Sequence, residues 1–192
     1  MENLELVTSR VDAARKLFQQ EETFDSQRIL GFAYQLVQAF NEGRTIAFVG
    51  NGGSAAEAMH LAAEFTGKCV LEHRPLNAIC LNESQSALTA VANDFGVDYI
   101  FSRQVEAHLK KGDLLVALST SGKSANILKA IQSAKELGVF VHLWMGDFEC
   151  SIDEIEIWKV SARSTPRIQE VHLVWGHLLA EVVEILISTD KF

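Results

Sequence analysis

The sequence predicts a three-layer α/β fold, in which a parallel β-sheet is covered by helices on both faces. Short apolar runs of the kind found in buried strands occur five times. Helical stretches of about 10 to 15 residues separate these runs, and that spacing suits the right-handed crossovers that join parallel strands. With 192 residues, of which 48% are hydrophobic and 22% charged, the chain is long enough to bury such a core. The five expected strands are residues 45–49, 77–81, 114–118, 140–144 and 156–160.

The clearest helix lies before the first expected strand. Asp25 and Ser26 are good capping residues at its start, and Gly43 marks its end. Between them, apolar residues recur with the three-and-four spacing of a helix that buries one face against a core. These residues are Ile29, Phe32, Ala33, Leu36, Val37 and Phe40.

Two further helices are expected near the ends of the chain. One covers residues 4–18, and a long one covers residues 166–187. The long helix has Thr165 as its cap and Pro166 at its first position, where proline is favoured. The chain has no internal repeat, low-complexity tract or linker, and its one irregular connection, 146–153, is too short to be a second domain. We therefore expect a single domain.

Composition argues against several classes of protein. Twenty-five acidic residues against 17 Lys and Arg give a net charge of −8, so the chain lacks the overall positive field that nucleic-acid binding uses. The N-terminus has no basic region followed by an apolar one, and no run approaches about 18 consecutive apolar residues. We expect a soluble cytoplasmic protein with no nucleic-acid or membrane partner. Three cysteines without C-x-x-C spacing argue against a disulfide framework and a thiolate zinc site, and we expect buried, reduced thiols at Cys69, Cys80 and Cys150.

A glycine-rich turn follows the first expected strand and opens a helix. Its residues Asn51, Gly52, Gly53 and Ser54 combine glycines, which allow positive φ and close backbone approach, with the free N–H groups of a helix start. The turn matches neither the dinucleotide-binding fingerprint nor the Walker motif. Because ligands gather beyond the carboxyl ends of parallel strands, we expect this turn to hold an anion such as phosphate.

A hydroxyl-rich turn follows the third expected strand. Ser119, Thr120, Ser121 and Ser124 also precede a helix. One hydroxyl is enough to cap a helix, so four within six residues favour phosphate binding over capping alone.

A third polar pair lies at another strand end. Asn93 and Asp94 follow a short helix expected over residues 84–92. By themselves they fit a helix stop as well as they fit a ligand site.

Two helices carry titratable residues that could meet. His60 and Glu64 lie four residues apart, so they share one helix face and could contact a common ligand or metal. On the last helix, Gln169 and His177 are about 80° apart around the axis and about 12 Å apart along it, whereas His172 lies about 140° from His177. Periodicity alone leaves His177 open to two interpretations, a hydrogen-bonded core histidine or a site residue.

Several of these motifs occur in an order and spacing that resemble the SIS-type sugar-phosphate isomerases, most closely the members that act on a heptose phosphate. The resemblance covers nearly the whole chain. It implies a flavodoxin-like five-stranded parallel sheet, with additional N-terminal helices in residues 1–43 that take part in oligomer packing. It also implies a phosphosugar-binding core in residues 44–192 of a single SIS domain, 1–192, and homotetramers with active sites at subunit contacts. The motifs are residues 50–54, His60 with Glu64, 93–96, 101–106, 119–124, and 165–170 with His172 and His177.

The resemblance also implies roles for individual residues. His60, Glu64, Gln169 and His177 would ligate one zinc ion per subunit, and Glu64 and His177 would transfer protons. The substrate would be bound by Asn51, Gly52, Gly53, Ser54, Glu64, Asn93, Asp94, Ser119, Thr120, Ser121, Ser124 and Gln169.

The implied reaction converts sedoheptulose 7-phosphate to D-glycero-D-manno-heptose 7-phosphate, the first step of nucleotide-activated heptose biosynthesis. Moving a proton between adjacent carbons through an enediol needs a base, an acid and stabilisation of negative charge. We assign Glu64 to the C1 proton and His177 to the oxygen or the second carbon. The chain departs from the family at Lys68, where close relatives usually have Arg, and in residues 146–150, so a related ketose phosphate is a further possible substrate.

Two alternative functions use the same fold. One is a non-catalytic SIS scaffold that binds the replication initiator protein, and its terminal helix lacks the second histidine. The other is a sugar-phosphate sensor, which needs phosphate-binding turns but no base. His177 together with His60 and Glu64 favours the isomerase over both.

Overall fold

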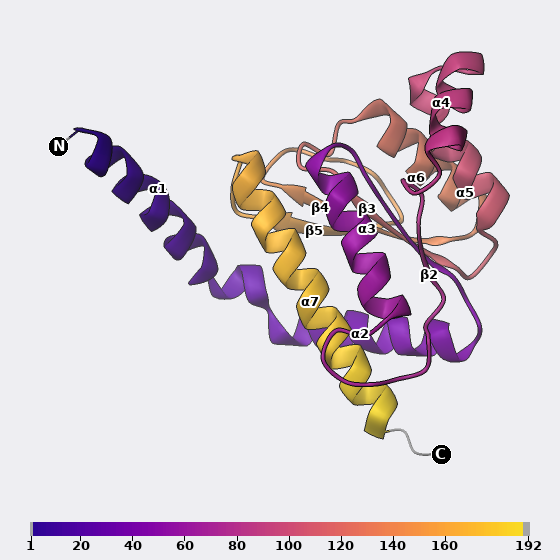
Figure 1. The fold of residues 1–192 in the computed structure, drawn as a ribbon, viewed down its shortest axis with the longest axis horizontal. Helices are drawn as coiled ribbons and strands as arrows, with labels where there is room; N and C mark the ends of the chain where they lie inside the picture. Colours follow the sequence, from indigo (N-terminus) through magenta and orange to yellow (C-terminus); the bar gives the residue numbers. More distant parts are fainter. Residues whose placement is uncertain (1, 190–192) are drawn as a thin grey trace.

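The computed structural model describes residues 2–189 and contains a five-stranded sheet in which all neighbouring strands are parallel (Figure 1). The strand order is β2-β1-β3-β4-β5, the flavodoxin-like order that the resemblance implied. Each of the five predicted strands is confirmed, with ends that differ from the prediction by at most two residues. The strands are β1 (Ile46–Gly50), β2 (Ala78–Cys80), β3 (Leu114–Leu118), β4 (Phe140–Gly146) and β5 (Glu156–Val160).

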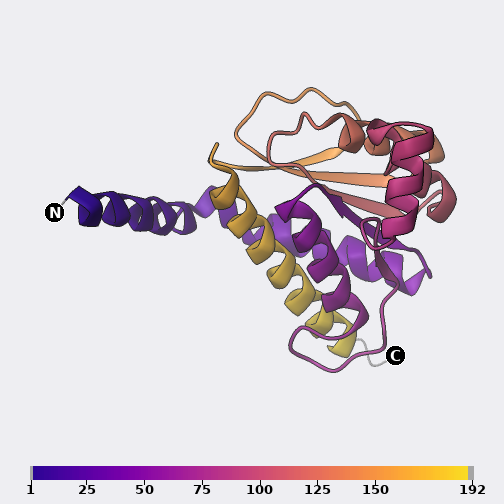
Figure 2. The same cartoon turned by 45° about the horizontal axis from the view of Figure 1, so that its top comes forward.

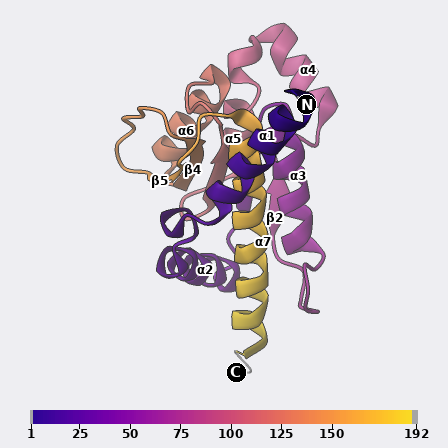
Figure 3. The same ribbon diagram turned by 90° about the vertical axis from the view of Figure 1, so that its left-hand side faces the viewer.

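Helices cover both faces of this sheet and complete the three predicted layers (Figures 1 and 3). α2, α3 and α7 pack on one face, and α5 and α6 pack on the other. The helices are α1 (Glu2–Phe18), α2 (Ser26–Asn41), α3 (Gly53–Thr66), α4 (Gln85–Asp94), α5 (Ser102–His108), α6 (Ala125–Leu137) and α7 (Thr165–Thr189), with short 3-10 turns η1 (Glu21–Phe24) and η2 (Val97–Tyr99).

Side chains of the central strands point alternately to the two faces of the sheet, so the hydrophobic core has two parts. In β1, Phe48 faces α2, α3 and α7, whereas Ala47 and Val49 face α5 and α6. Every residue of β1 and β3 is buried, as expected for a parallel sheet with helices on both sides. These two strands therefore give a rigid base to the turns at their carboxyl ends.

The starts of two helices agree with the capping signals in the sequence, whereas Thr165, the expected cap of the last helix, is the first residue of α7. The Asp25 side chain accepts hydrogen bonds from the backbone N–H groups of Gln27 and Arg28, which confirms it as the N-cap of α2. Ser84 caps α4 in the same way. This helix extends two residues further than expected, so Asn93 and Asp94 form its last turn and do not follow it.

α7 is long and apolar enough to cross a membrane, with a hydropathy of 1.5 over Thr165–Ser188, even though polar residues interrupt its apolar runs. Its contacts show a different role. Trp175 packs against Trp144 and Trp158, with ring centroids 5.7 and 5.3 Å apart, and Val183 is fully buried. α7 is therefore a core helix of this domain.

α1 projects away from the rest of the chain as an arm (Figures 1 and 2). Much of its apolar surface is exposed to solvent, including Leu4, Leu6, Val7 and Val11. Such a row of exposed apolar side chains is typical of a helix that packs against another protein surface.

Candidate active site

The turn between β1 and α3 can adopt its shape only with glycine at two positions. A Cβ on Gly50 would lie 2.4 Å from the backbone oxygen of Ser54, and Gly52 has a positive φ of 56°. A Cβ on Gly53 would lie 2.5 Å from Nε2 of Gln169, so α7 approaches the turn closely. The glycines thus bring the start of α3 and the side chain of Gln169 together.

Gln169 contacts the glycine turn through its amide group. Its Nε2 donates a hydrogen bond to Oγ of Ser54 over 3.2 Å. Both residues were predicted to bind substrate, and the structure brings them into contact. Their carbonyl and hydroxyl groups lie beyond the carboxyl ends of the strands, where ligands bind in sheets of this type.

The glycine turn and the hydroxyl turn are joined by a pair of asparagines. Asn51 donates to Oδ1 of Asn126 over 2.8 Å, and Asn126 donates back to Oδ1 of Asn51 over 3.0 Å. The sequence analysis missed Asn126, which is a buried polar residue two positions after Ser124. Its signal in the sequence is a polar side chain on the buried face of an amphipathic helix.

The hydroxyl turn leaves its side chains available for a ligand. Oγ of Ser119 is buried and has no hydrogen-bond partner within residues 2–189. Ser124 occupies the N-cap position of α6 but makes no side-chain cap bond. Oγ of Ser121 accepts a hydrogen bond from the N–H of Lys123 over 3.2 Å. Because the N-cap hydroxyl does not cap the helix, this turn fits ligand binding better than it fits capping alone.

Asn93 and Asp94 lie apart from these contacts in the described chain. Nδ2 of Asn93 donates to Oδ1 of Asp94 over 2.7 Å, and both side chains are exposed at the end of α4. Neither makes a hydrogen bond to the glycine turn or the hydroxyl turn. Their role in substrate binding stays a prediction.

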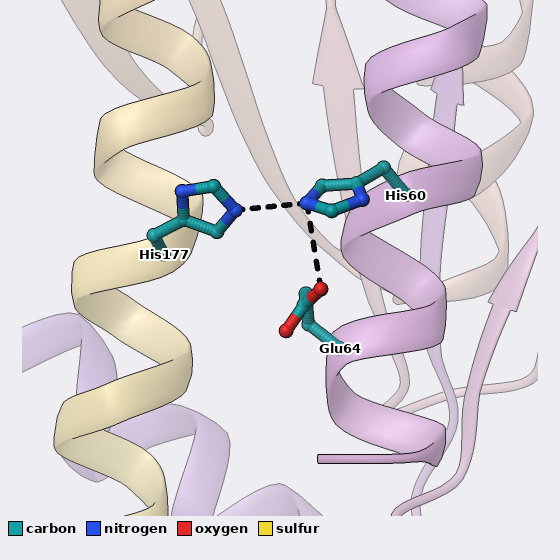
Figure 4. Close-up of side chains that lie close together, drawn as sticks. All are labelled: His60, Glu64 and His177. Carbon is teal, nitrogen blue, oxygen red and sulfur yellow. Dashed lines mark hydrogen bonds and ion pairs between the residues drawn. The ribbon is translucent and has the colours of Figure 1, made fainter. Parts of the chain in front are cut away.

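His60, Glu64 and His177 form a cluster between α3 and α7 (Figure 4). Nε2 of His60 lies 2.8 Å from Nε2 of His177 and 3.4 Å from Oε1 of Glu64. The side chain of Glu64 is 18% exposed and that of His60 is 45% exposed, so the cluster is open to solvent on one side. This arrangement favours the second interpretation of His177, because its ring contacts His60 and is not packed in the core. Its role as a site residue stays a prediction.

His172 is the core histidine of the same helix. It is fully buried and stacks on Trp175, with ring centroids 5.7 Å apart. Burial lowers its pKa to about 3, so the ring is neutral at physiological pH. The helix arithmetic that placed His172 on a different face from His177 is confirmed.

The cluster has a donor set that suits zinc. Its candidate ligand atoms, two imidazole nitrogens and one carboxylate oxygen, all lie within 4.8 Å of one another. Small side-chain movements would bring all three within the bond length of about 2.0 to 2.2 Å from a common ion. The fourth expected ligand, Gln169, lies about two helical turns nearer the glycine turn, where it contacts Ser54.

Glu57 is a further acidic residue near the glycine turn that the sequence analysis missed. It shares the His60 and Glu64 face of α3, three residues before His60. Both of its carboxylate oxygens are buried and have no hydrogen-bond partner in the part of the chain that the structure describes, and burial raises its pKa to about 7. The spacing of positions 57, 60 and 64 along one helix face is the signal that would have found it.

The cysteines are free thiols, as expected. Cys80 is buried, whereas Cys69 and Cys150 are only partly buried, so the prediction of burial is wrong for those two. Cys69 lies near Glu64 and Glu184. Burial, together with the nearby carboxylates of Glu64 and Glu184, raises the pKa of Cys69 to about 12.

Comparisons with known proteins identify the family of this chain. The family model described as the SIS domain matches residues 11–142. A phosphoheptose isomerase from Rhodospirillum rubrum is 51% identical over 144 residues, which cover 74% of this chain and 77% of that protein. A phosphoheptose isomerase from Campylobacter concisus is 41% identical over 186 residues, covering 93% of this chain and 95% of that protein.

Solved structures of phosphoheptose isomerases share the fold of this chain. A phosphoheptose isomerase from Neisseria gonorrhoeae has a TM-score of 0.84 and 33% identity, covering 95% of this chain and 98% of that one. A phosphoheptose isomerase from Francisella tularensis has a TM-score of 0.87 and 27% identity, covering 96% of this chain and 100% of that one. With this domain match and these relatives, the chain belongs to the phosphoheptose isomerase family of SIS-domain proteins.

Proposed function

We propose that this chain is an aldose–ketose isomerase that converts sedoheptulose 7-phosphate to D-glycero-D-manno-heptose 7-phosphate. The observation that carries the proposal is the cluster of His60, Glu64 and His177, which places a carboxylate base beside two imidazoles. The relatives named phosphoheptose isomerase support the same reaction.

The cluster supplies the two proton-transfer groups that an enediol reaction needs. Glu64 removes a proton from C1 of the ketose, the electron pair left on C1 forms the C1–C2 double bond, and the C2 carbonyl oxygen takes up a proton to give the enediol. The C1 hydroxyl then loses its proton as C2 gains one, which gives the aldose. His177 moves the proton at the oxygen or delivers the proton to C2. Glu64 lies on α3 and His177 lies on α7, and both contact His60 (Figure 4). The acid and the base are therefore close together.

The substrate phosphate would bind at the two turns beyond β1 and β3. The free Oγ of Ser119 and the uncapped start of α6 at Ser124 supply hydrogen-bond donors there, and helix N-termini favour anions. Binding the phosphate at a distance from the reacting carbons would orient the sugar for proton transfer. The net charge of −8 means that this attraction comes from local groups rather than from the whole protein.

One zinc ion per subunit would be held by His60, Glu64 and His177, with Gln169 as the further ligand that the family resemblance implies. When bound, zinc would supply Lewis-acid polarisation of the carbonyl oxygen. The positions and chemistry of Glu64 and His177 support the proposed role of these two residues in proton transfer.

The same proposal includes a homotetramer with active sites at subunit contacts, in a cytoplasmic enzyme. Residues 1–43 would take part in the packing, and the exposed apolar side chains of α1, such as Leu4 and Val7, support this role. The site cluster favours the isomerase over a scaffold or a sensor, because neither alternative needs a base next to two histidines.

An isomerisation assay tests the proposed function. Purified protein is mixed with sedoheptulose 7-phosphate in deuterated buffer, and NMR follows the aldose and the deuterium at C2. Wild-type protein should convert the ketose, and Glu64→Gln should lose turnover by at least about 1,000-fold while the substrate still protects it against unfolding. Glu83→Gln, an exposed glutamate outside the site, is the control and should react as the wild type does. Lack of conversion by zinc-supplemented wild-type protein would refute the proposal.

A further inference from the structure

A cavity of about 480 Å³ lies between α2 and the sheet, away from the catalytic cluster. On the sheet side it is formed by residues 139–142 and 154–156, at the amino ends of β4 and β5. The glycine turn and the hydroxyl turn follow the carboxyl ends of β1 and β3, so this cavity is at the opposite edge of the sheet. Its volume is within the range of about 300 to 1,000 Å³ that is typical of small-molecule sites.

α2 leaves space on its side of the cavity because it has a glycine there. Gly31 lies within α2 and lines the cavity. A Cβ at this position would meet no atom of residues 2–189 within 4 Å, apart from its own turn of the helix and its chain neighbours. Glycine inside a helix makes the helix less stable than a larger residue would. Gly31 therefore lowers the stability of α2 and keeps the cavity open.

A buried histidine in the wall has a ring nitrogen without a partner. His142 of β4 is 3% exposed, and its Nε2 lies 3.0 Å from Oε1 of Gln35. An amide oxygen only accepts hydrogen bonds, so Nε2 carries the proton and Nδ1 has a lone pair. Nδ1 is buried and has no hydrogen-bond partner among the residues that the structure describes. Burial lowers the pKa of His142 to about 3, so the ring is neutral, and a ligand with an N–H or O–H donor would satisfy Nδ1.

The charged groups around the cavity favour a neutral ligand. The Arg28 guanidinium donates to the carbonyl oxygen of Ile157 and lies 4.8 Å from the ring centroid of Trp158, with further N–H groups left for a ligand. The carboxylates of Glu154 and Glu156 also line the cavity. Two anions beside one cation disfavour a phosphate, and the net charge of −8 acts in the same direction.

The rest of the lining is mostly apolar and includes aromatic rings. Phe32 and Trp158 are buried there, and Phe140 is 57% exposed. A ligand therefore needs apolar faces to cover this surface and polar atoms along one edge to reach His142 and Arg28. A nucleobase has this form, since its flat faces stack on aromatic rings and its edge carries N–H donors beside acceptors. A free sugar has hydroxyl groups around its whole ring, and an apolar wall leaves many of them without a partner.

We propose that this cavity is a second binding site, which takes a nucleoside: the base donates an N–H hydrogen bond to Nδ1 of His142, accepts one from Arg28 and packs against Phe140. Binding here does not depend on the isomerase reaction. Adenosine is the ligand to test, because its N6 amine is a donor beside the N7 acceptor.

Equilibrium dialysis of radiolabelled adenosine against the purified protein tests the site. Wild-type protein should bind about one adenosine per chain with a Kd of about 0.1 mM, which is typical of a ligand of this size. N6,N6-dimethyladenosine lacks the N–H donor and should bind at least about 10-fold more weakly. No binding of adenosine at about 1 mM, or equal affinity for the two nucleosides, would overturn the proposal. Displacement of adenosine by D-ribose at the same concentration would show that the cavity takes a sugar, and would overturn it too.

Filling the cavity from α2 tests its location. Gly31→Leu places a side chain in open space, so this variant should be at least as stable as wild type in urea unfolding. It should bind adenosine at least about 10-fold more weakly than wild type does. Gln27→Leu introduces leucine at an exposed position of α2 that does not line the cavity, and this control should bind adenosine as wild type does. Wild-type affinity in Gly31→Leu would overturn the location.

His142→Phe tests the hydrogen bond to Nδ1. The new ring retains the stacking on Phe32, where the ring centroids are 3.7 Å apart, but has no acceptor. Adenosine and N6,N6-dimethyladenosine should therefore bind this variant with equal affinity. A preference for adenosine that persists in His142→Phe would overturn the assigned contact.

Competition with a sugar phosphate separates this cavity from the catalytic cluster. Saturating sedoheptulose 7-phosphate should leave adenosine binding unchanged, and Glu64→Gln should bind adenosine as wild type does. Displacement of adenosine by the sugar phosphate would place the nucleoside at the catalytic cluster and overturn the proposal. Dialysis does not measure turnover, so adenosine binding by a protein that fails to isomerise the heptose phosphate would refute the proposed reaction and leave the second site in place.

Discussion

Gly176 of α7 lies against Leu61 of α3 so closely that a Cβ at position 176 would be 2.1 Å from Cδ2 of Leu61. The two helices run side by side there (Figures 1 and 3). The next residue on α7, His177, meets His60, the residue before Leu61. The distance between the helices at this point therefore sets the distance between the histidines of the cluster.

Gly176→Ala should separate the two helices and damage the cluster. The added methyl group overlaps a fully buried leucine, and overpacking of this kind costs about 1 to 3 kcal/mol of stability. We also expect a loss of isomerase activity of at least about 10-fold, because His177 would move away from His60 and Glu64. Urea unfolding and steady-state kinetics measure the two effects.

A compensating change provides the control for this prediction. Leu61→Val, which shortens the side chain that the new methyl group meets, should restore part of the activity when it is combined with Gly176→Ala. If Gly176→Ala alone has wild-type activity, the helix contact does not set the geometry of the cluster.

Glu57 should make the protein less stable as the pH rises. Burial raises its pKa to about 7 from the ordinary value of 4.5, so the folded protein binds this proton more tightly than the unfolded chain does. Below about pH 4.5 Glu57 is protonated in the folded and the unfolded protein, so it does not lower the free energy of unfolding. Above about pH 7 it is ionised in both, and the free energy of unfolding is lowered by the full amount. After screening by solvent we expect this cost to be about 1 to 2 kcal/mol.

Urea unfolding of wild type and Glu57→Gln between pH 5 and pH 8 measures this cost. The stability of Glu57→Gln relative to wild type should increase across this range, and the difference removes the contribution of other titrating groups. A difference that is constant with pH would show that Glu57 ionises normally in the folded protein.

Glu184 should stabilise the folded protein, and this stabilisation should be lost at acidic pH. Burial alone would raise its pKa, but hydrogen bonds from Leu71, Val70 and Cys69, together with nearby His73, outweigh burial and lower the pKa. Its contribution to stability is therefore present above the ordinary pKa of about 4.5 and is lost as the pH falls through the lower folded value. Glu184→Gln should be about 3 kcal/mol less stable than wild type at pH 7, since it leaves a buried network incomplete.

The same comparison at lower pH tests the sign of this effect. The stability gap between wild type and Glu184→Gln should shrink as the pH is lowered from 5.5 toward 3, whereas Glu181→Gln, an exposed change one turn earlier on α7, should show no such trend. A gap that widens toward acid pH would contradict a lowered pKa for Glu184.

The sequence allowed the strands and the main helices to be predicted because their signals are local. Apolar runs such as residues 114–118 and a cap such as Asp25 depend on neighbours in the chain. Helix geometry also separated His172 from His177, since the two lie on different faces of one helix. These local patterns were enough to place the glycine turn and the hydroxyl turn at strand ends.

Contacts between distant segments could not be predicted in this way. Asn126 pairs with Asn51 from 75 residues away, and Glu184 meets Cys69 from 115 residues away. In the sequence, Asn126 and Glu184 are each only a polar residue in an amphipathic helix. Gln169 shows the same limit, because its partner Ser54 becomes apparent only when α7 lies beside the glycine turn.

Zinc binding should depend on the three clustered residues and should show whether Gln169 is a ligand. Wild-type protein loaded with zinc and then desalted should retain about one ion per chain by elemental analysis. His60→Gln and His177→Gln should each weaken zinc binding by at least about 10-fold in a competition titration with a chromogenic chelator. His108→Gln, an exposed histidine at the end of α5, is the control and should bind zinc as the wild type does.

Gln169→Ala gives the deciding comparison in the same titration. If the amide of Gln169 leaves Ser54 to join the cluster, this variant should bind zinc about 10- to 100-fold more weakly than wild type. If zinc affinity is unchanged while the KM for the sugar phosphate rises, Gln169 supports the glycine turn through Ser54, and the ion is held by His60, Glu64 and His177 without it. Wild-type affinity in both His60→Gln and His177→Gln would exclude the cluster as the zinc site.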